Sequence, residues 1–223
     1  YSLMGPDGSL SSVVKADFDQ ILSGKDVKIP MHLMGKIAWL LWHRYQAGAY
    51  PIAMVSMDNC SHNGDKLKEA VVSYVRKWVE AGACGQDFLE YLNNPEKVSF
   101  PLSMIDKITP RPDKNVVAML EQDGFEDAEL IITDKNTYTA AFVNAEATQY
   151  LVIEDLFPNG RPPLEKGGIY FTDRETVDRV EKMKVCTCLN PLHTALAFFG
   201  CLLGYHTIWE EMKDDDLCAF VTK

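Results

Sequence analysis

The sequence lacks the marks of a membrane or secreted protein. Its longest apolar run is Ile37–Trp42, far short of the roughly 20 residues that cross a bilayer. No basic stretch followed by an apolar one comes after Tyr1, so the residues give no sign of a secretory leader. We therefore expect no membrane partner.

Basic residues are too few for a chain that binds polyanions. Lys and Arg number 22 against 32 Asp and Glu, which gives a net charge of −10. An acidic surface repels nucleic acids and anionic lipids, so neither is an expected partner. A local basic pocket for an anionic small molecule is still compatible with this charge.

Cysteines are few and follow no metal or disulfide pattern. Disulfide frameworks are typical of small secreted domains, and structural zinc sites use paired C-x-x-C spacings. Cys186-x-Cys188 and Cys60-x-His62 match neither pattern. We predict buried thiols, no metal site and a reducing, cytoplasmic setting. The six cysteines are Cys60, Cys84, Cys186, Cys188, Cys201 and Cys218.

The Gly-rich dinucleotide fingerprint G-x-G-x-x-G is also absent. The composition is nevertheless that of a folded protein, with 47% hydrophobic and 24% charged residues in a chain of 223. Tyr1–Gly8 reads as the end of a strand running into a turn, and Phe220–Lys223 stops without a tail. We therefore expect a fragment of a longer protein, with an oligomeric state that the sequence leaves open. A full-length sequence that starts with Met a few residues before Tyr1 would contradict this expectation.

The first part of the chain has the pattern of a helix that leads into a buried strand. Pro30 suits the first turn of a helix over residues 30–48, where apolar residues recur at helical spacing. The apolar run Ile52–Ser56 is typical of a strand buried on both faces of a parallel sheet. Together they form half of a doubly wound unit. The polar segment Asp58–Gly64 then lies at the strand's carboxyl end, where such sheets bind ligands.

The pattern changes after Gly64. We place a domain boundary there, with residues 1–64 as the C-terminal part of a dinucleotide-binding domain and residues 65–223 as a mostly helical, truncated substrate domain. The predicted fold class is α/β, a doubly wound nucleotide-binding sheet followed by this helical part. Predicted helices cover 65–81, 86–92, 115–122 and 172–205, the last interrupted at Pro191, and predicted extended segments cover 98–109, 128–133, 139–143, 150–154 and 168–171.

One stretch of the helical part carries residues suited to proton transfer. Asn190 and His193 are three apart and share a face if the segment is helical, and Lys184 lies just before them. A buried Lys is a good general acid or base because desolvation lowers its pKa. A carboxamide can polarise a carbonyl oxygen and hold the alkoxide formed from it. By themselves, however, an Asn and a His at this spacing also occur as an ordinary buried hydrogen-bonded pair.

Four segments in order resemble the mannitol dehydrogenase and hexuronate reductase family of long-chain polyol dehydrogenases. From first to last they span about two thirds of the chain, and four weak motifs in order are more specific than any one of them. They are Val55–Asp65, Phe100–Pro110, Tyr150–Pro162 and Glu181–Gly204.

The resemblance implies roles for six residues. Lys184 matches the family's general acid/base, and Asn190 and Asn59 match the two amides that hold the reacting oxygen, Asn59 lying also at the cofactor. His193 matches the His that orients the substrate and the Lys. The remaining two are Asp106, which matches an acidic residue beside the substrate, and Glu181, which matches a Glu linked to proton movement.

The resemblance also implies the reaction. The family transfers hydride to or from NAD without a catalytic metal, and its Gly-rich motif lies upstream of the part seen here. We expect interconversion of fructuronate and mannonate, because the segments Ile105–Pro110 and Leu189–His193 look more like hexuronate reductases. Mannitol 2-dehydrogenase is the close alternative, and a non-catalytic sugar-binding homologue is another.

One departure from the family pattern affects Lys184. The family has its Asn five residues after the Lys, whereas Asn190 comes six after Lys184. On a regular helix one extra residue rotates the Lys by about 100°. A single-turn π-bulge absorbs one inserted residue, or Pro191 opens a second helix so that Asn190 lies near an N-cap. Lys182 is the fallback acid/base, although its spacing fits worse.

Two other polar clusters have ordinary explanations. Asp58–Asn59 and His62–Gly64 are also typical of turn chemistry after a strand, and for His62 and Asn63 the sequence does not decide between a turn and a functional site. The acidic run Asp214–Asp216 is typical of a solvated surface.

Overall fold

The computed structural model describes residues 1–24, 27–105, 107, 111–134, 136–145 and 150–222. The chain divides into two compact units, one formed by Tyr1–Met104 with Val152–Lys223 and the other by Ile105–Leu151. Asp106, the expected substrate-binding carboxylate, lies outside the described residues.

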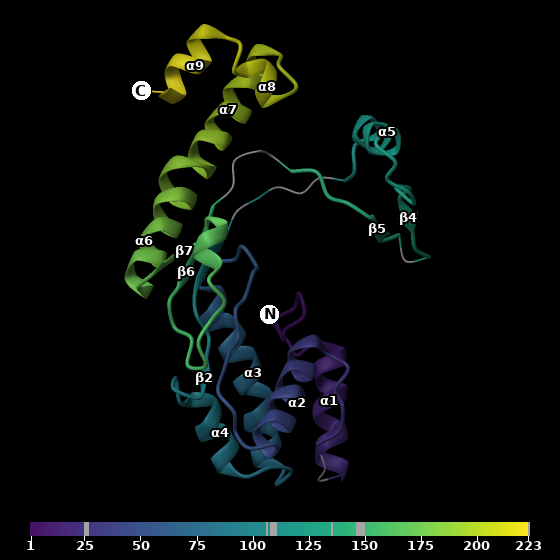
Figure 1. The fold of residues 1–223 in the computed structure, drawn as a ribbon, viewed down its shortest axis with the longest axis vertical. Coiled ribbons are helices and arrows are strands. Elements are labelled where there is room, and N and C mark those ends of the chain that lie inside the picture. Colours follow the sequence, from purple (N-terminus) through teal and green to yellow (C-terminus); the bar gives the residue numbers. More distant parts are fainter. Residues whose placement is uncertain (25–26, 106, 108–110, 135, 146–149, 223) are drawn as a thin grey trace. The chain divides into compact units, whose positions relative to one another are not determined.

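Helices dominate the described part of the chain, as the periodicity predicts (Figure 1). The π-helical turn Lys184–Cys188 joins the helices Arg174–Met183 and Asn190–Leu203 into one continuous rod. The α-helices are α1 (Ser12–Gly24), α2 (Leu33–Gln46), α3 (Asn63–Glu80), α4 (Gln86–Asn93), α5 (Lys114–Gln122), α6 (Arg174–Met183), α7 (Asn190–Leu203), α8 (Ile208–Glu211) and α9 (Asp215–Thr222), and the short 3-10 helix is Leu164–Gly167.

The strands are short and form small sheets. β1 pairs in parallel with β2, β3 joins β6 and β7 in a sheet in which β6 and β7 run parallel, and β4 pairs with β5 in antiparallel. Parallel pairing is the arrangement expected of a doubly wound unit. The strands are β1 (Ile52–Ala53), β2 (Val98–Ser99), β3 (Ser103–Ile105), β4 (Ile131–Ile132), β5 (Tyr138–Thr139), β6 (Leu151–Glu154) and β7 (Tyr170–Thr172).

The strand predicted over residues 52–56 is shorter and less buried than expected. β1 ends at Ala53, and both its residues are only half-buried. Among the described residues β2 is its one strand partner, so its other edge lacks a described strand. The prediction of a strand buried on both faces was therefore wrong in its extent, while its parallel pairing was right.

The main core lies between α2, α3 and α4. Tyr74, Val75 and Trp78 of α3 are fully buried, and Phe88 of α4 packs on Trp42 with ring centroids 5.0 Å apart. The face of α3 is uniform because its apolar residues recur three and four apart. This packing makes α3 a rigid base for the polar residues at its N-terminal end.

Helix α1 was not predicted from the sequence. Ser11 Oγ accepts the amide of Val14 at 3.3 Å, a capping contact. Val14, Phe18 and Ile21 are buried against the core at spacings of four and three residues. The apolar pattern was therefore present, but Val13 and Leu22 are apolar and exposed, so the buried face does not stand out in the sequence.

The second unit is built around a hairpin and α5. Asp113 caps α5 by accepting the amide of Asn115 at 2.8 Å. The amide of Thr133 donates to the carbonyl of Thr137 at 2.8 Å within the hairpin. Both residues of β4 are exposed, so the described part of this unit has little core of its own.

Candidate functional site

The loop after β1 presents Asn59 at its tip. The amide of Cys60 donates to Asp58 Oδ1 at 2.8 Å and lowers the pKa of that carboxyl. This turn holds the backbone on both sides of Asn59, whose own side chain is exposed. An exposed amide at the carboxyl end of a parallel strand is free to meet a ligand.

The buried side chain of Asn63 holds this loop in place. It is 1% exposed, and its Nδ2 donates to the carbonyl of Asp58 at 2.7 Å and to that of Ser103 at 3.0 Å. Its Oδ1 accepts the amides of Gly64 at 2.8 Å and Ser103 at 3.1 Å. Ser103 Oγ donates in turn to the carbonyl of Ser56. The side chain of Asn63 thus ties the Asn59 loop to β3, a role that the sequence alone left open.

Gly64 allows the start of α3 to lie against the chain before β3. A Cβ added at Gly64 would lie 2.5 Å from the carbonyl oxygen of Phe100 and 2.6 Å from that of Pro101. Only glycine accommodates so close a backbone approach. The motif Asn63–Gly64 is therefore a packing device that positions the loop.

His62 caps α3 in the left-handed conformation, with φ 53° and ψ 43°. Its Nε2 lies 2.9 Å from Asp178 Oδ1, and its Nδ1 lies 3.3 Å from Asp65 Oδ2. Its backbone amide donates to Glu181 Oε2 at 3.3 Å. His62 is thus placed where the Asn59 loop, α3 and α6 meet.

A second polar connection joins α6 to both α3 and β6. Arg174 Nη2 contacts both carboxylate oxygens of Asp65 at 2.5 Å, and its Nη1 donates to Glu154 Oε2 at 3.1 Å. Glu154 is buried and also accepts the amide of Leu102 at 2.9 Å. Charge-assisted bonds of this kind are the stronger class of hydrogen bond, so α6 is held at its first turn.

The π-helical turn accommodates the extra residue before Asn190. The amide of Leu189 donates to the carbonyl of Lys184 at 2.7 Å, a bond over five residues. Of the two devices considered from the sequence, the π-bulge is present. The helix also bends at Leu189, and Pro191 lies in the first turn of α7. Asn190 is the first residue of α7 and does not occupy the N-cap position, which is Leu189.

The structure brings some of the predicted residues together along one rod. Glu181 is buried near the end of α6, and Lys184 is half-buried at the first position of the π-turn. Asn190 and His193 are exposed and share a face of α7. Glu181 reaches the segment of Asn59 through the amide of His62. These positions leave the roles of the residues as predictions.

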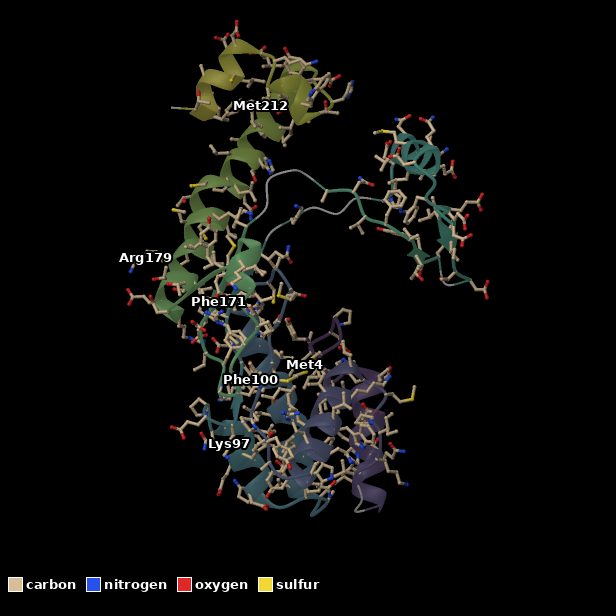
Figure 2. The ribbon with its side chains drawn as sticks, in the orientation of Figure 1. Met4, Lys97, Phe100, Phe171, Arg179 and Met212 are labelled. Atoms are coloured by element: carbon tan, nitrogen blue, oxygen red, sulfur yellow. The ribbon has the colours of Figure 1, made fainter. Side chains whose placement is uncertain are left out.

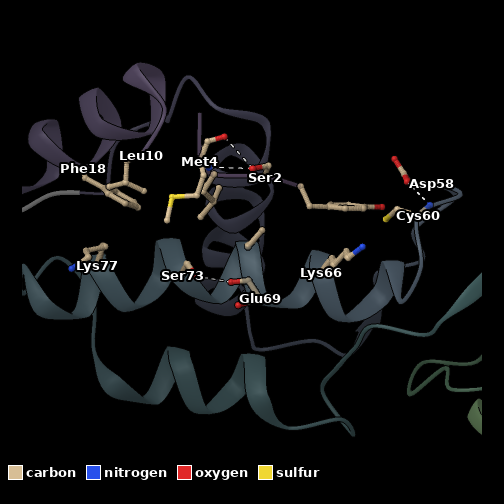
Figure 3. A pocket seen from close by; sticks show the side chains of 13 residues that line it. Ser2, Met4, Leu10, Phe18, Asp58, Cys60, Lys66, Glu69, Ser73 and Lys77 are labelled. Carbon is tan, nitrogen blue, oxygen red and sulfur yellow. Dashed lines mark hydrogen bonds between the residues drawn. The ribbon is translucent and has the colours of Figure 1, made fainter. Parts of the chain in front are cut away.

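A cleft of about 690 Å³ opens beside the Asn59 loop. Figure 3 shows Met4, Leu10 and Phe18 on one side of it, facing α3. Its end at the loop is polar and includes Asp58, Cys60 and Lys66. Its lining combines apolar side chains with a few polar ones, as the lining of ligand pockets commonly does. Among the described residues no group of three or more His, Cys, Asp or Glu side chains could hold a metal ion.

The arrangement defines a Rossmann-type dehydrogenase fold. A crystal structure of D-sorbitol dehydrogenase in substrate-free form matches with a TM-score of 0.73 at 25% identity, over 98% of this chain and 40% of that one. Pseudomonas fluorescens mannitol 2-dehydrogenase, in a ternary complex with NAD and D-mannitol, matches with a TM-score of 0.65 at 28% identity, over 92% and 37%.

The sequence comparison identifies the family. Residues 5–166 match the family described as "Mannitol dehydrogenase Rossmann domain". The chain therefore belongs to the mannitol dehydrogenase family, and both the resemblance and the predicted fold class are confirmed. The boundary predicted at residue 64 stays a prediction.

Two curated relatives indicate where in the family the chain lies. D-mannonate oxidoreductase of Thermotoga maritima is 54% identical over 187 residues, which cover 83% of this chain and 34% of the relative. Mannitol 2-dehydrogenase of Neosartorya fischeri is 32% identical over 203 residues, which cover 87% and 35%. The chain thus spans about a third of the length of these relatives.

Proposed function

We propose that the whole protein to which this chain belongs is an oxidoreductase that interconverts fructuronate and mannonate, with NAD as cofactor. The observation that carries the proposal is the 54% identity to a D-mannonate oxidoreductase, against 32% to a mannitol 2-dehydrogenase. NAD is supported by the complex in which the P. fluorescens structure was solved. The chain's own Rossmann match agrees with a dinucleotide cofactor.

The residues present fit the reactive end of such a cofactor. The exposed Asn59 lies in the loop that follows the carboxyl end of β1, and the neighbouring cleft reaches this loop at Asp58 and Cys60. Open α/β sheets bind their ligands at this edge. A bound nicotinamide would supply or accept the hydride.

Lys184 is the proposed proton donor and acceptor. In the reductive direction its ammonium gives a proton to the carbonyl oxygen of the substrate, and in the oxidative direction its neutral amine takes the proton back. The amides of Asn59 and Asn190 donate hydrogen bonds to the oxygen as negative charge develops on it. No metal is needed in this scheme, because these three groups already supply the proton and stabilise the charge.

The neighbours of Lys184 orient and connect it. His193, one turn after Asn190, is proposed to orient the substrate and the amine. Glu181, one turn before Lys184, is proposed to take part in proton movement, and its burial beside the amide of His62 supports a fixed carboxylate there. The π-turn supports the scheme, since such turns recur at functional sites. Asp106 keeps its proposed place beside the substrate.

The proposal is tested with the full-length protein and NADH. Fructuronate is expected to be reduced faster than fructose, and equal or faster turnover of fructose would instead favour a mannitol 2-dehydrogenase, which the 32% relatives also support. Lys184→Ala is expected to lower the rate about 100- to 10,000-fold. Lys182→Ala is the matched comparison, and a loss confined to that variant would transfer the role to Lys182. Sugar binding without turnover would favour the non-catalytic alternative.

We propose a cytoplasmic protein with a small-molecule sugar or sugar-acid substrate and no nucleic-acid or membrane partner. The net charge of −10 supports the absence of a nucleic-acid or anionic-membrane partner. The stretch Arg174–Leu203 is long and apolar enough to cross a membrane by length and composition alone. It also carries Lys184, Asn190 and His193, and polar groups are costly in lipid. Recovery of the protein in the membrane fraction of lysed cells would contradict this proposal.

A further inference from the structure

We propose that His62 is a positioning residue that locks the helix bearing Lys184 against the loop bearing Asn59. The inference deepens the proposed function, because it concerns how those two residues are brought to the same oxygen. His62 lies three residues after Asn59, and Glu181 lies three residues before Lys184. The hydrogen bond from the amide of His62 to Glu181 therefore joins the segment of Asn59 to the segment of Lys184.

The backbone of His62 is held in an uncommon conformation. A positive φ of 53° is unfavourable for a residue with a Cβ, and it persists only where the surroundings enforce it. This conformation coincides with an amide that donates to Glu181 on one side and a ring that lies between Asp65 and Asp178. One residue thus contacts α6 through both its main chain and its side chain.

The matching face of α6 is a polar stripe. Arg174, Asp178 and Glu181 are four and three residues apart, so they lie on one face of the helix. Arg174 contacts Asp65, while Asp178 and Glu181 contact His62. Lys184 follows Glu181 by three residues and continues the stripe. The contacts of this stripe therefore fix how α6 is rotated about its axis, and with it the position of Lys184.

Apolar burial contributes little to holding α6. Of its residues only Val177 and Glu181 are buried, and Val177 is the one apolar member. A helix with one buried apolar residue depends on polar contacts for its exact position. The charged groups that face His62 are Asp65 on α3 and Asp178 and Glu181 on α6, with Arg174 and Lys182 paired to those aspartates.

A double-mutant cycle in the full-length enzyme tests the lock. His62→Asn keeps a residue that tolerates the left-handed conformation and removes the imidazole. Asp178→Asn removes the charge opposite, and Asp178→Glu is the conservative variant. Each Asn variant is expected to lower kcat with fructuronate about 10- to 100-fold while NADH affinity is kept. The double variant is expected to be no worse than the poorer single one, because both remove the same contact.

Arg179→Gln is the matched control on the same helix. Arg179 pairs with Glu175 on the exposed side of α6, with side chains 72% and 82% exposed, and it points away from the neighbouring ribbon in Figure 2. Its loss is expected to leave kcat within about twofold, since exposed pairs contribute little. Asp178→Glu is expected to recover most of the rate lost in Asp178→Asn.

Two readouts separate positioning from general damage. The pH profile of kcat is expected to shift in His62→Asn, because the surroundings of Lys184 change, whereas a smaller folded fraction would lower the whole profile without moving it. Amide hydrogen exchange of α6, measured without substrate, is expected to speed up in both single variants while α3 stays protected. Additive losses, an unmoved pH profile or unchanged exchange in α6 would overturn the proposal. The exchange result stands even if the wild-type enzyme turns over neither sugar, so the two proposals fail separately.

Discussion

The amide of Leu189 donates to the carbonyl of Lys184 at 2.7 Å, across five residues where an α-helix would use four. This bond closes the π-turn that separates the two halves of the rod. A π-turn takes up one extra residue without rotating the helix on either side of it. The side chains of Lys184 and Asn190 can therefore keep the same relative orientation about the helix axis that a five-residue spacing gives on a regular helix.

Deleting Thr187 is expected to convert the π-turn into regular helix and to keep activity within about tenfold, because the flanking helices stay in phase. Deleting Met183 is the matched control. It removes a residue from the regular helix between Glu181 and Lys184, which rotates Lys184 by about 100° and is expected to cost at least about 100-fold. Rates for the two deletions, each checked by circular dichroism, decide between these outcomes. Equal losses would show that the π-turn does not set the phase.

Substitution of Asn63 is expected to lower the stability of the protein, whereas substitution of Asn59 is expected to lower its rate. Asn63→Ala leaves the carbonyl of Asp58 and the amide of Ser103 without their partner, and it is expected to cost about 1–3 kcal/mol of the free energy of unfolding. Asn59→Ala changes an exposed side chain and is expected to keep stability while lowering the rate. Urea unfolding and steady-state rates on both variants test the contrast. A stable Asn63→Ala would remove Asn63 as the support of the loop.

Gly64→Ala is expected to destabilise the protein by about 1–3 kcal/mol, because its Cβ would meet two backbone carbonyls. Gly167→Ala is the control, since a Cβ there meets open space. Thermal unfolding of both variants measures the difference. Similar melting temperatures for Gly64→Ala and the wild type would show that the chain before β3 can move away at little cost.

The contact between α6 and α3 is expected to weaken in acid. A hydrogen bond from Lys182, with a further contribution from His62, lowers the pKa of Asp178 below its ordinary value of 3.8. A carboxyl whose pKa is lower in the folded state stabilises the fold above the unfolded pKa, and this contribution is lost as the pH falls through the folded pKa. The protection factors of the α6 amides, which are corrected for the intrinsic pH dependence of exchange, should therefore fall as the pH drops below 3.8. Asp178→Asn is expected to flatten that fall in protection, and an unchanged fall would assign it to other carboxyls.

Local patterns in the sequence determined the helices and the family motifs. The spacing of apolar residues predicted α2, α3, α4 and α5 to within a few residues. A helix that buries one face has apolar residues that recur three and four positions apart, so it can be recognised in the sequence. The extra residue before Asn190 allowed either a π-turn or a break at Pro191, and the structure contains the π-turn. Helix α1 shows the limit, since it carries the apolar Val13 and Leu22 on its exposed side and its buried face does not stand out.

Only the tertiary structure decided what the residues around Asn59 do. His62 and Glu181 are 119 positions apart, and Asn63 and Ser103 are 40 apart. Their neighbourhoods read in sequence as turn and helix residues. Nothing periodic links such pairs, because their contact depends on how whole elements pack. The sequence named the candidate catalytic residues, and the packing of α6 on α3 revealed the polar lock that we propose holds them in place.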